Sequence, residues 1–249
     1  KFGNYQQRQK YLELQGRLDL TEFEDIFKEI NDIETIQTVD LPLEFISLCN
    51  KHLPIHSKTP LEYLRKRGIS KWDILKWKIG YCKEGRYAGR IIIPSINNDG
   101  DCNYFIARSY IGHDYRYLNP PCGRDIIFNA LMVDWDEPVV LVEGVFDAIV
   151  VGDNAIPILG STLREDSRLF QALAIHDTPV FVALDPDAEK KAHWMIRSLM
   201  KYDLEVKKIN LEEYEDIGSM SKSVFMQKLK NAEDVDGDMY WLEKQLRNI

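Results

Sequence analysis

Short apolar segments alternate with helical patterns from Pro138 onward, and this alternation constrains the fold more than any other feature of the chain. It predicts four strands, at Val139–Glu143, Ala155–Leu159, Val180–Asp185 and Val206–Leu211. Helices are expected between them, at Phe146–Val151, from Thr162 onward and at Ala188–Tyr202. Glu165, three residues after Thr162, would complete a capping box. Such alternation is typical of an α/β fold with a mostly parallel sheet and helices on both faces.

The first half of the chain has a different pattern. Apolar residues between Pro60 and Tyr81 predict two short helices broken at Gly68, and residues 90–110 predict two strands around an Asn-Asn-Asp-Gly turn. Apolar residues at helical spacing within the acidic segment 1–40 indicate a helix. The predicted organisation is a helical lead-in or linker at 1–50, a basic, mixed α+β N-terminal subdomain at 51–136, a mostly parallel-sheet domain at 137–212 and short C-terminal helices at 213–249.

Charge is distributed unevenly along the chain. The formal net charge is −8, yet residues 51–130 carry 14 Lys and Arg against 7 Asp and Glu, and residues 131–249 carry 13 against 23. A basic middle joined to an acidic end indicates a phosphate-binding surface beside a carboxylate metal site. Segregation of charge by chance is the alternative.

Composition argues against several classes of protein. No apolar run approaches the roughly 20 residues of a membrane span, so no membrane partner is expected. The four cysteines are isolated, which favours reduced thiols in a cytoplasmic setting and argues against a zinc ribbon within the chain. No GxxxxGK[ST] loop occurs, so we expect no helicase motor. The chain begins with Lys1 rather than Met, and we expect further residues upstream.

Acidic residues follow two of the predicted strands. Glu143 closes the first strand and precedes Gly144, and Asp185 closes the third strand and is followed by Pro186 and Asp187. Ligands of open parallel sheets bind at the carboxyl ends of the strands, so these three carboxylates are expected to lie together. A carboxylate cluster repels itself unless cations occupy it, and its hard oxygens select Mg²⁺ or Mn²⁺.

These acidic motifs resemble the TOPRIM signature, in which a Glu-Gly motif precedes an Asp-x-Asp motif. The matching segments are VVLVEGVFDAI at 139–149 and FVALDPDAEKKA at 181–192. Three further segments resemble the polymerase core of bacterial-type or phage-type (DnaG-like) DNA primases: YLRKRGISKWDILKWKIGY at 63–81, GRIIIPSINNDGDCNYFIARSY at 89–110 and RYLNP at 116–120. They stand in the family's order, and the compact tail is similar to that of phage-type members.

The resemblance implies a set of site residues. Glu143, Asp185 and Asp187 would hold two or more Mg²⁺ or Mn²⁺ ions, or Glu143 would instead help to deprotonate the primer 3′-hydroxyl. Asp216 stands where the family has a further acidic residue, with a helix N-cap as the alternative. The family's basic positions, which contact nucleoside triphosphate or template, are matched by Arg67, Arg108 and Arg116. Further basic candidates are Arg90 (with a surface salt bridge as the alternative), Arg124, Lys190 and Lys191.

The sequence also departs from the family's pattern. Arg116 stands where Lys is usual, and Asn129 stands in the segment after Phe128 where a second Lys is expected, so that Arg124 is a possible substitute. The run Glu189–Lys191 replaces a Gly that usually follows the Asp-x-Asp motif. These departures concern the contacts with the nucleotide rather than the metal site.

The resemblance implies a DNA-directed RNA polymerase that makes short RNA primers on single-stranded DNA from ribonucleoside triphosphates, by two-metal nucleotidyl transfer. Such an enzyme would work beside a replicative helicase on a separate chain, in the cytoplasm (of a bacterial host if phage-encoded), and its zinc ribbon would lie upstream of Lys1. Two alternatives stay open: a TOPRIM nuclease that cuts DNA or RNA with the same acids, and a non-catalytic nucleic-acid-binding helicase adaptor.

Overall fold

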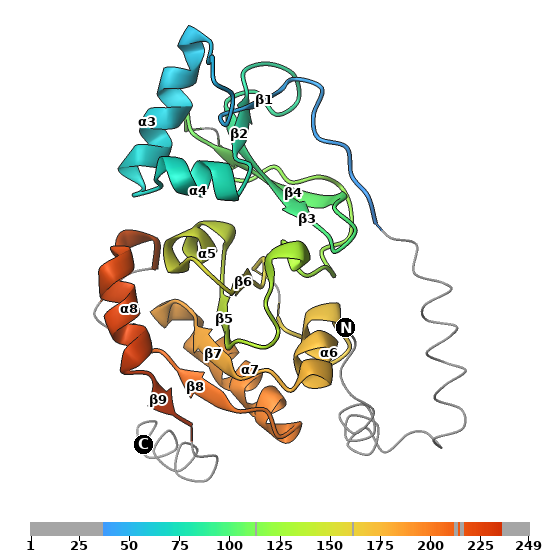
Figure 1. Cartoon of the computed structure of the whole chain (residues 1–249), viewed down its shortest axis with the longest axis vertical. Helices are drawn as coiled ribbons and strands as arrows, with labels where there is room; N and C mark the ends of the chain where they lie inside the picture. Colours follow the sequence, from blue (N-terminus) through green and yellow to red (C-terminus); the bar gives the residue numbers. More distant parts are fainter. Residues whose placement is uncertain (1–36, 113, 161, 212–213, 215–216, 236–249) are drawn as a thin grey trace.

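The computed structural model describes residues 37–235 apart from 113, 161, 212–213 and 215–216. These residues form two subdomains, one above the other in Figure 1, each built around its own sheet. The N-terminal subdomain contains β1 (Phe45–Ser47), α3 (Lys58–Lys66), α4 (Lys71–Lys76), β2 (Gly80–Cys82), β3 (Arg90–Ile96) and β4 (Cys102–Ser109). The second subdomain contains β5 (Val139–Val142), α5 (Val145–Val151), β6 (Ala155–Pro157), α6 (Arg168–His176), β7 (Val180–Ala183), α7 (Glu189–Lys201), β8 (Val206–Lys208), α8 (Lys222–Lys230) and β9 (Glu233–Asp234).

The N-terminal sheet is antiparallel, with strand order β1-β2-β3-β4. The predicted hairpin is confirmed: β3 and β4 are joined by a turn in which the side chain of Asn97 accepts hydrogen bonds from the backbone of Asp99 and Asp101. Gly100 has a φ of +91°, a conformation that a residue with a Cβ rarely adopts. The two short helices are confirmed as well, and Gly68 with φ +74° separates them.

The second sheet has the strand order β6-β5-β7-β8-β9, and its first four strands are parallel. β9 pairs with β8 in the antiparallel direction. Each parallel pair is connected through a helix, as the alternation of apolar segments predicts. The α/β fold class expected from the sequence is therefore confirmed.

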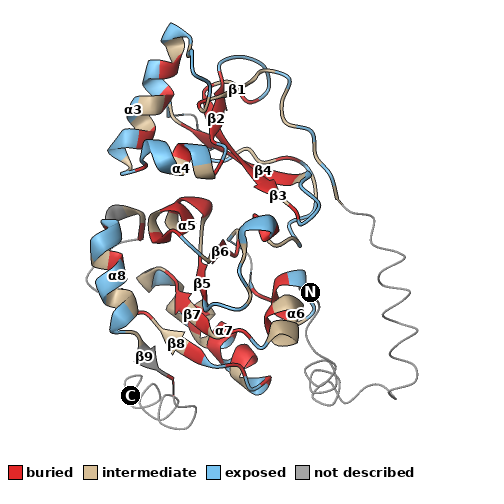
Figure 2. Cartoon of the chain, viewed as in Figure 1, coloured by how far each residue is buried: buried red, intermediate tan, exposed pale blue. Residues whose placement is uncertain are grey.

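Alternate residues of β5 point into two different apolar layers. Val139 and Leu141 belong to the cluster that includes residues of α6 and α7, whereas Val140 and Val142 belong to the cluster that includes residues of α5 and α8. All four side chains are buried, which explains why the strand has no polar alternation. In Figure 2, β5 and most of α5 have the colour of buried residues, whereas α3 and α8 carry much of the exposed surface.

One apolar cluster joins the two subdomains. It includes Leu64, Ile93 and Tyr104 of the N-terminal subdomain together with Phe146 and Phe225 of the second. An ion pair between Lys76, at the end of α4, and Asp153, after α5, adds a polar contact at the edge of the same junction. Because the cluster is shared, the two subdomains are packed against each other, and this packing fixes the position of one relative to the other.

The expected start of one helix and its capping box need correction. The helix expected to begin at Thr162 begins at Arg168, after the N-cap Ser167. Glu165 makes no capping box, because its carboxylate accepts hydrogen bonds from Tyr202 (2.9 Å) and Lys201 (3.2 Å) at the end of α7.

The segments flanking the two sheets are described only in part. The described part of the lead-in, 37–50, is extended and contributes β1 to the N-terminal sheet. In the C-terminal segment 213–249, one helix is present as α8, and the strand β9 follows it. The remaining predictions for 1–36 and 236–249 lie outside the part of the chain that the structure describes.

Candidate functional site

Two acidic segments meet at the carboxyl edge of the parallel sheet. Glu143 directly follows β5 and Asp185 follows β7, and these strands are neighbours with Val142 paired to Ala183. Carboxylate oxygens of Glu143, Asp185 and Asp187 all lie within 4.8 Å of one another. The proximity expected from the strand ends is therefore present in the structure.

Local turns fix the direction of these acids. The backbone NH of Gly144 donates a hydrogen bond to Asp147 Oδ2 (2.9 Å), which closes the first turn of α5 immediately after Glu143. A Cβ at position 144 would lie 3.1 Å from that oxygen, so any larger residue there would need the Asp147 side chain to shift by a few tenths of an ångström. After β7, Pro186 begins a 3₁₀ turn (Pro186–Ala188) in which the NH of Ala188 donates to the carbonyl of Asp185.

The carboxylates have cationic neighbours on α7. Lys191 Nζ lies 3.1 Å from Glu143 Oε1, and both side chains are largely buried. At the first residue of α7, Glu189 accepts hydrogen bonds from Lys208 (2.7 Å) and His193. The run that replaces the expected glycine therefore brings one positive charge to the carboxylate cluster. The predicted nucleotide-binding role of Lys190, which is exposed, and of Lys191 stays a prediction.

The donor set of the cluster fits a divalent cation. Three carboxylates at this separation repel one another, and a hard cation with oxygen ligands relieves that repulsion. Among the described residues, this is the group of three acidic, histidine or cysteine side chains close enough to share an ion. Glu143, Asp185 and Asp187 are thus the residues that could hold Mg²⁺ or Mn²⁺.

A cleft of about 500 Å³ adjoins the carboxylates and is lined by residues of both subdomains. The second subdomain contributes Glu143, Gly144, Val145, Phe146, Asp147, Leu159, Gly160, Asp185 and Gly218. The N-terminal subdomain and the segment that follows β4 contribute Arg67, Ile106, Arg108, Arg116, Tyr117, Asn119 and Arg124. Four of the predicted basic residues therefore share one cleft with two of the predicted acids.

Two of the arginines are held by aromatic residues. Tyr63 Oη accepts a hydrogen bond from Arg67 Nε (2.9 Å) and another from Arg108 Nε (2.7 Å). Arg108 also donates to the hydroxyl of Tyr117. Both guanidinium groups lie over the ring of Phe146, at 5.0 Å for Arg67 and 5.2 Å for Arg108.

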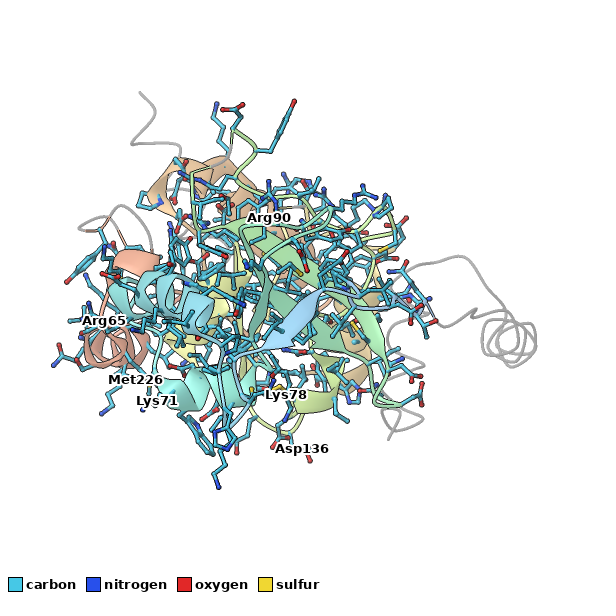
Figure 3. The ribbon with its side chains drawn as sticks, turned by 90° about the horizontal axis from the view of Figure 1, so that it is seen from above. Arg65, Lys71, Lys78, Arg90, Asp136 and Met226 are labelled. Atoms are coloured by element: carbon cyan, nitrogen blue, oxygen red, sulfur yellow. The ribbon has the colours of Figure 1, made fainter. Side chains whose placement is uncertain are left out.

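Arg90 has a different environment from the other basic candidates. It is buried and is the first residue of β3, where Figure 3 labels it. Its guanidinium donates to the backbone carbonyls of Tyr115 (2.8 Å) and Arg116 (3.3 Å), and burial lowers the pKa of this group. Arg90 does not line the cleft described above, and it forms no surface salt bridge within the described residues; it anchors the loop that carries Arg116.

Asp216, the remaining acidic candidate, lies outside the described residues. Sequence reasoning missed Tyr63, Tyr117 and Phe146, which contact the arginines. Their aromatic side chains have the spacing of ordinary core residues, and no local pattern distinguishes them. The available signal was that Tyr63 stands four residues before Arg67, so that the two side chains meet on one face of a helix.

The fold and the site define the class of protein. The described chain has the fold of the DnaG primase core, including a TOPRIM-type parallel sheet, as comparison with solved structures shows. The E. coli primase catalytic core matches with a TM-score of 0.63 at 16% identity, over 79% of each chain. A DnaG primase catalytic domain bound to single-stranded DNA matches with a TM-score of 0.62 at 18% identity, over 93% of this chain and 81% of that one.

The sequence supports the same assignment. It is 26% identical to the DNA primase of Thermotoga maritima over 177 residues, which are 53% of this chain and 31% of that relative. No protein-family model matches the chain. The resemblance to bacterial-type, DnaG-like primases is thus confirmed in fold and in sequence, while the chain spans less than a third of that relative's length. The phage-type assignment stays a prediction.

Proposed function

We propose that this chain is the catalytic core of a DNA primase, which joins ribonucleotides into short RNA primers on a single-stranded DNA template. The observation that carries the proposal is that Glu143 and Asp185 line the same cleft as four arginines. Phosphoryl transfer depends mainly on positioning the reactants and on neutralising phosphate charge. The carboxylates of this cleft could hold cations for that purpose, and its arginines could bind the phosphates.

Each set of residues has a defined part in the proposed reaction. The primer 3′-oxygen forms a bond to the α-phosphorus of the incoming nucleotide, the bond to pyrophosphate breaks, and the hydroxyl proton is released. Glu143, Asp185 and Asp187 would hold two divalent cations, which when bound neutralise charge on the attacking and leaving oxygens. Arg67, Arg108, Arg116 and Arg124 would bind phosphate groups of the triphosphate or the template through their paired NH donors.

Two of the proposed partners follow from the same cleft. Ribonucleoside triphosphates and single-stranded DNA both present phosphates to the arginines, and one structural neighbour is a primase catalytic domain bound to single-stranded DNA. A replicative helicase on a separate chain is proposed as a further partner. No helix among the described residues is both long and apolar enough to cross a membrane.

One assay distinguishes the proposed function from its alternatives. The chain is incubated with single-stranded DNA, labelled ribonucleotides and Mg²⁺ or Mn²⁺, and the products are separated by length. New short RNA supports a primase core. Shortened DNA would indicate a TOPRIM nuclease, and unchanged DNA without new RNA would indicate a non-catalytic nucleic-acid-binding module.

A further inference from the structure

Arg108 is a buried cation without an acidic partner in the described part of the chain. Its exposed fraction is 9%, and it contacts the hydroxyls of Tyr63 and Tyr117 and the rings of Tyr117 and Phe146. Burying a charge is costly unless it is paired, and phenol oxygens and ring faces compensate it only in part. Arg108 therefore places a positive charge at the wall of the cleft, and a bound anion would neutralise that charge.

Arg67 is the second member of this arrangement. Its Nε donates to the same Tyr63 oxygen that Arg108 uses, and its guanidinium lies 5.3 Å from the Tyr63 ring centroid and 5.0 Å from the Phe146 ring centroid. No ion pair joins Arg67 to an acid among the residues described. Tyr63 occupies the Nε atom of each arginine, and Tyr117 accepts from one terminal nitrogen of Arg108. The other terminal NH groups are the donors that remain for a ligand.

Phe146 connects the arginines to the acidic edge of the second sheet. It lies in the first turn of α5, three residues after Glu143, and its side chain is 5% exposed. Its ring is a contact surface for both guanidinium groups. The position of α5 thus determines how far the arginine pair lies from the carboxylates.

We propose that Tyr63 and Phe146 are positioning residues that hold Arg67 and Arg108 as one preformed phosphate-binding pair. The Tyr63 hydroxyl fixes the orientation of both guanidinium groups, and the Phe146 ring sets their place relative to Glu143. The ligand is a phosphate group, supplied by a nucleoside triphosphate or by the template backbone. This inference rests on the proposed function for its biological meaning, but its tests measure phosphate binding directly.

The sharpest variant is Tyr63→Phe, which removes one hydroxyl and keeps the ring over Arg67. Losing an acceptor shared by two charged donors frees both side chains, and we expect about fivefold weaker phosphate binding, the factor that corresponds to roughly 1 kcal/mol. The matched control is Tyr81→Phe, because the Tyr81 hydroxyl also makes a partly buried hydrogen bond (2.7 Å, with His56) but is not an acceptor for Arg67 or Arg108. The control should bind like the wild type.

A second variant, Phe146→Leu, removes the aromatic face and keeps an apolar side chain. We expect a similar, about fivefold, loss of phosphate binding, since both guanidinium groups lose the ring face that sets their place. Phe170→Leu is its control, because Phe170 is completely buried among α6 and α7 and lies in the other apolar cluster. Melting temperatures of the two leucine variants show whether they are folded alike.

Two probes distinguish the source of the phosphate. Inorganic tripolyphosphate in the presence of a chelator represents the triphosphate, and an oligothymidylate strand represents the template backbone. Weaker binding of either probe by Tyr63→Phe and Phe146→Leu, but not by their controls, supports the proposal and identifies the source. Binding of both probes with wild-type affinity overturns it.

A double-mutant comparison shows whether the two residues act through the arginines. In the Arg67→Ala/Arg108→Ala background, adding Tyr63→Phe should change the affinity no further. An additional, fully additive loss would overturn the positioning role. If the wild type makes primers, Tyr63→Phe should raise KM for ATP by about fivefold and leave kcat nearly unchanged, as for lost ground-state binding. If it makes none, the binding measurements still decide the inference, and only the proposed function fails.

Discussion

Asp185 and Asp187 stand one residue apart at the end of β7, and together with Glu143 they present oxygens within 4.8 Å of one another. A divalent cation that binds the folded chain and not the unfolded one stabilises the fold, by an amount that grows with the logarithm of the ion concentration above Kd. We predict that added Mn²⁺ raises the melting temperature of the wild type by several degrees, as expected for about 1–2 kcal/mol.

The same titration should leave Asp185→Asn and Asp187→Asn almost unshifted. In a chelator, both variants should melt at or above the wild-type temperature, because each removes one charge from a repelling cluster. Asp203→Asn, which alters an exposed acid at the other end of α7, is the control and should respond to Mn²⁺ like the wild type. An equal shift in the Asp185 and Asp187 variants would contradict their assignment as ligands.

Cys82 allows a prediction about pH. Burial, with a smaller contribution from Glu44, raises the pKa of this thiol from its usual 9.0 to about 12. The folded chain therefore keeps a proton that the unfolded chain loses above pH 9, and stability falls as the pH rises from 9 toward 12. The urea midpoint of the wild type should drop between neutral pH and about pH 10, and the drop should be smaller for Cys82→Ala. Equal drops would show that Cys82 contributes nothing to it.

Single residues differ in how well the sequence predicts their place. The acids were predictable, because an apolar strand followed by Glu or Asp puts the carboxylate at a known edge of a parallel sheet. Arg67 and Arg108 were identified from the resemblance alone. Phe146 and Tyr63 were missed, since their contacts to both arginines depend on how two sheets pack, which no local pattern encodes.

At the scale of the elements, α6 shows how a local pattern can mislead. Thr162 and Glu165 have capping-box spacing, but the Glu165 carboxylate binds Tyr202 and Lys201, and the Ser167 hydroxyl accepts from the NH of Phe170 instead. The tertiary hydrogen bonds of Glu165 therefore replace the local capping box that the spacing predicts. β1 and β9, with three and two residues, are too short for any periodicity and exist because a neighbouring strand pairs with them.

The corrected helix start gives a testable difference between two residues. Ser167→Ala should lower the free energy of unfolding by about 1 kcal/mol, since it removes the N-cap. Thr162→Ala, at the expected but incorrect start, should change it by less than about 0.5 kcal/mol. Urea unfolding of both variants measures the two values. A larger loss of unfolding free energy for Thr162→Ala than for Ser167→Ala would show that Thr162, and not Ser167, caps the helix.

At the scale of the whole molecule, charge is divided between the two parts of the chain. A basic segment at 51–130 and an acidic one at 131–249 meet at the cleft. When arginines bind the phosphates of a nucleic acid, the nucleic acid releases its counterions. The affinity for single-stranded DNA should therefore fall steeply as the salt concentration rises. Arg67→Ala or Arg108→Ala should reduce the slope of log K against log salt by about 0.7–1.

Arg164→Ala is the matched control for this salt series, because Arg164 is exposed, pairs with Asp166 and does not line the cleft. Its slope should equal that of the wild type. An affinity for DNA that does not depend on salt would mean that the basic segment is only a solvated surface.

Template-directed extension of a supplied RNA primer tests the central claim most directly. The acidic segments 1–50 and 131–249 should weaken template binding, and phosphate contacts carry no sequence information. We therefore expect elongation to be easier than initiation. The wild type with Mn²⁺ should add the ribonucleotide complementary to the template, and Asp187→Asn should add none. Extension that ignores the template base, shortening of the DNA, or full activity of Asp187→Asn would contradict a primase site built on these carboxylates.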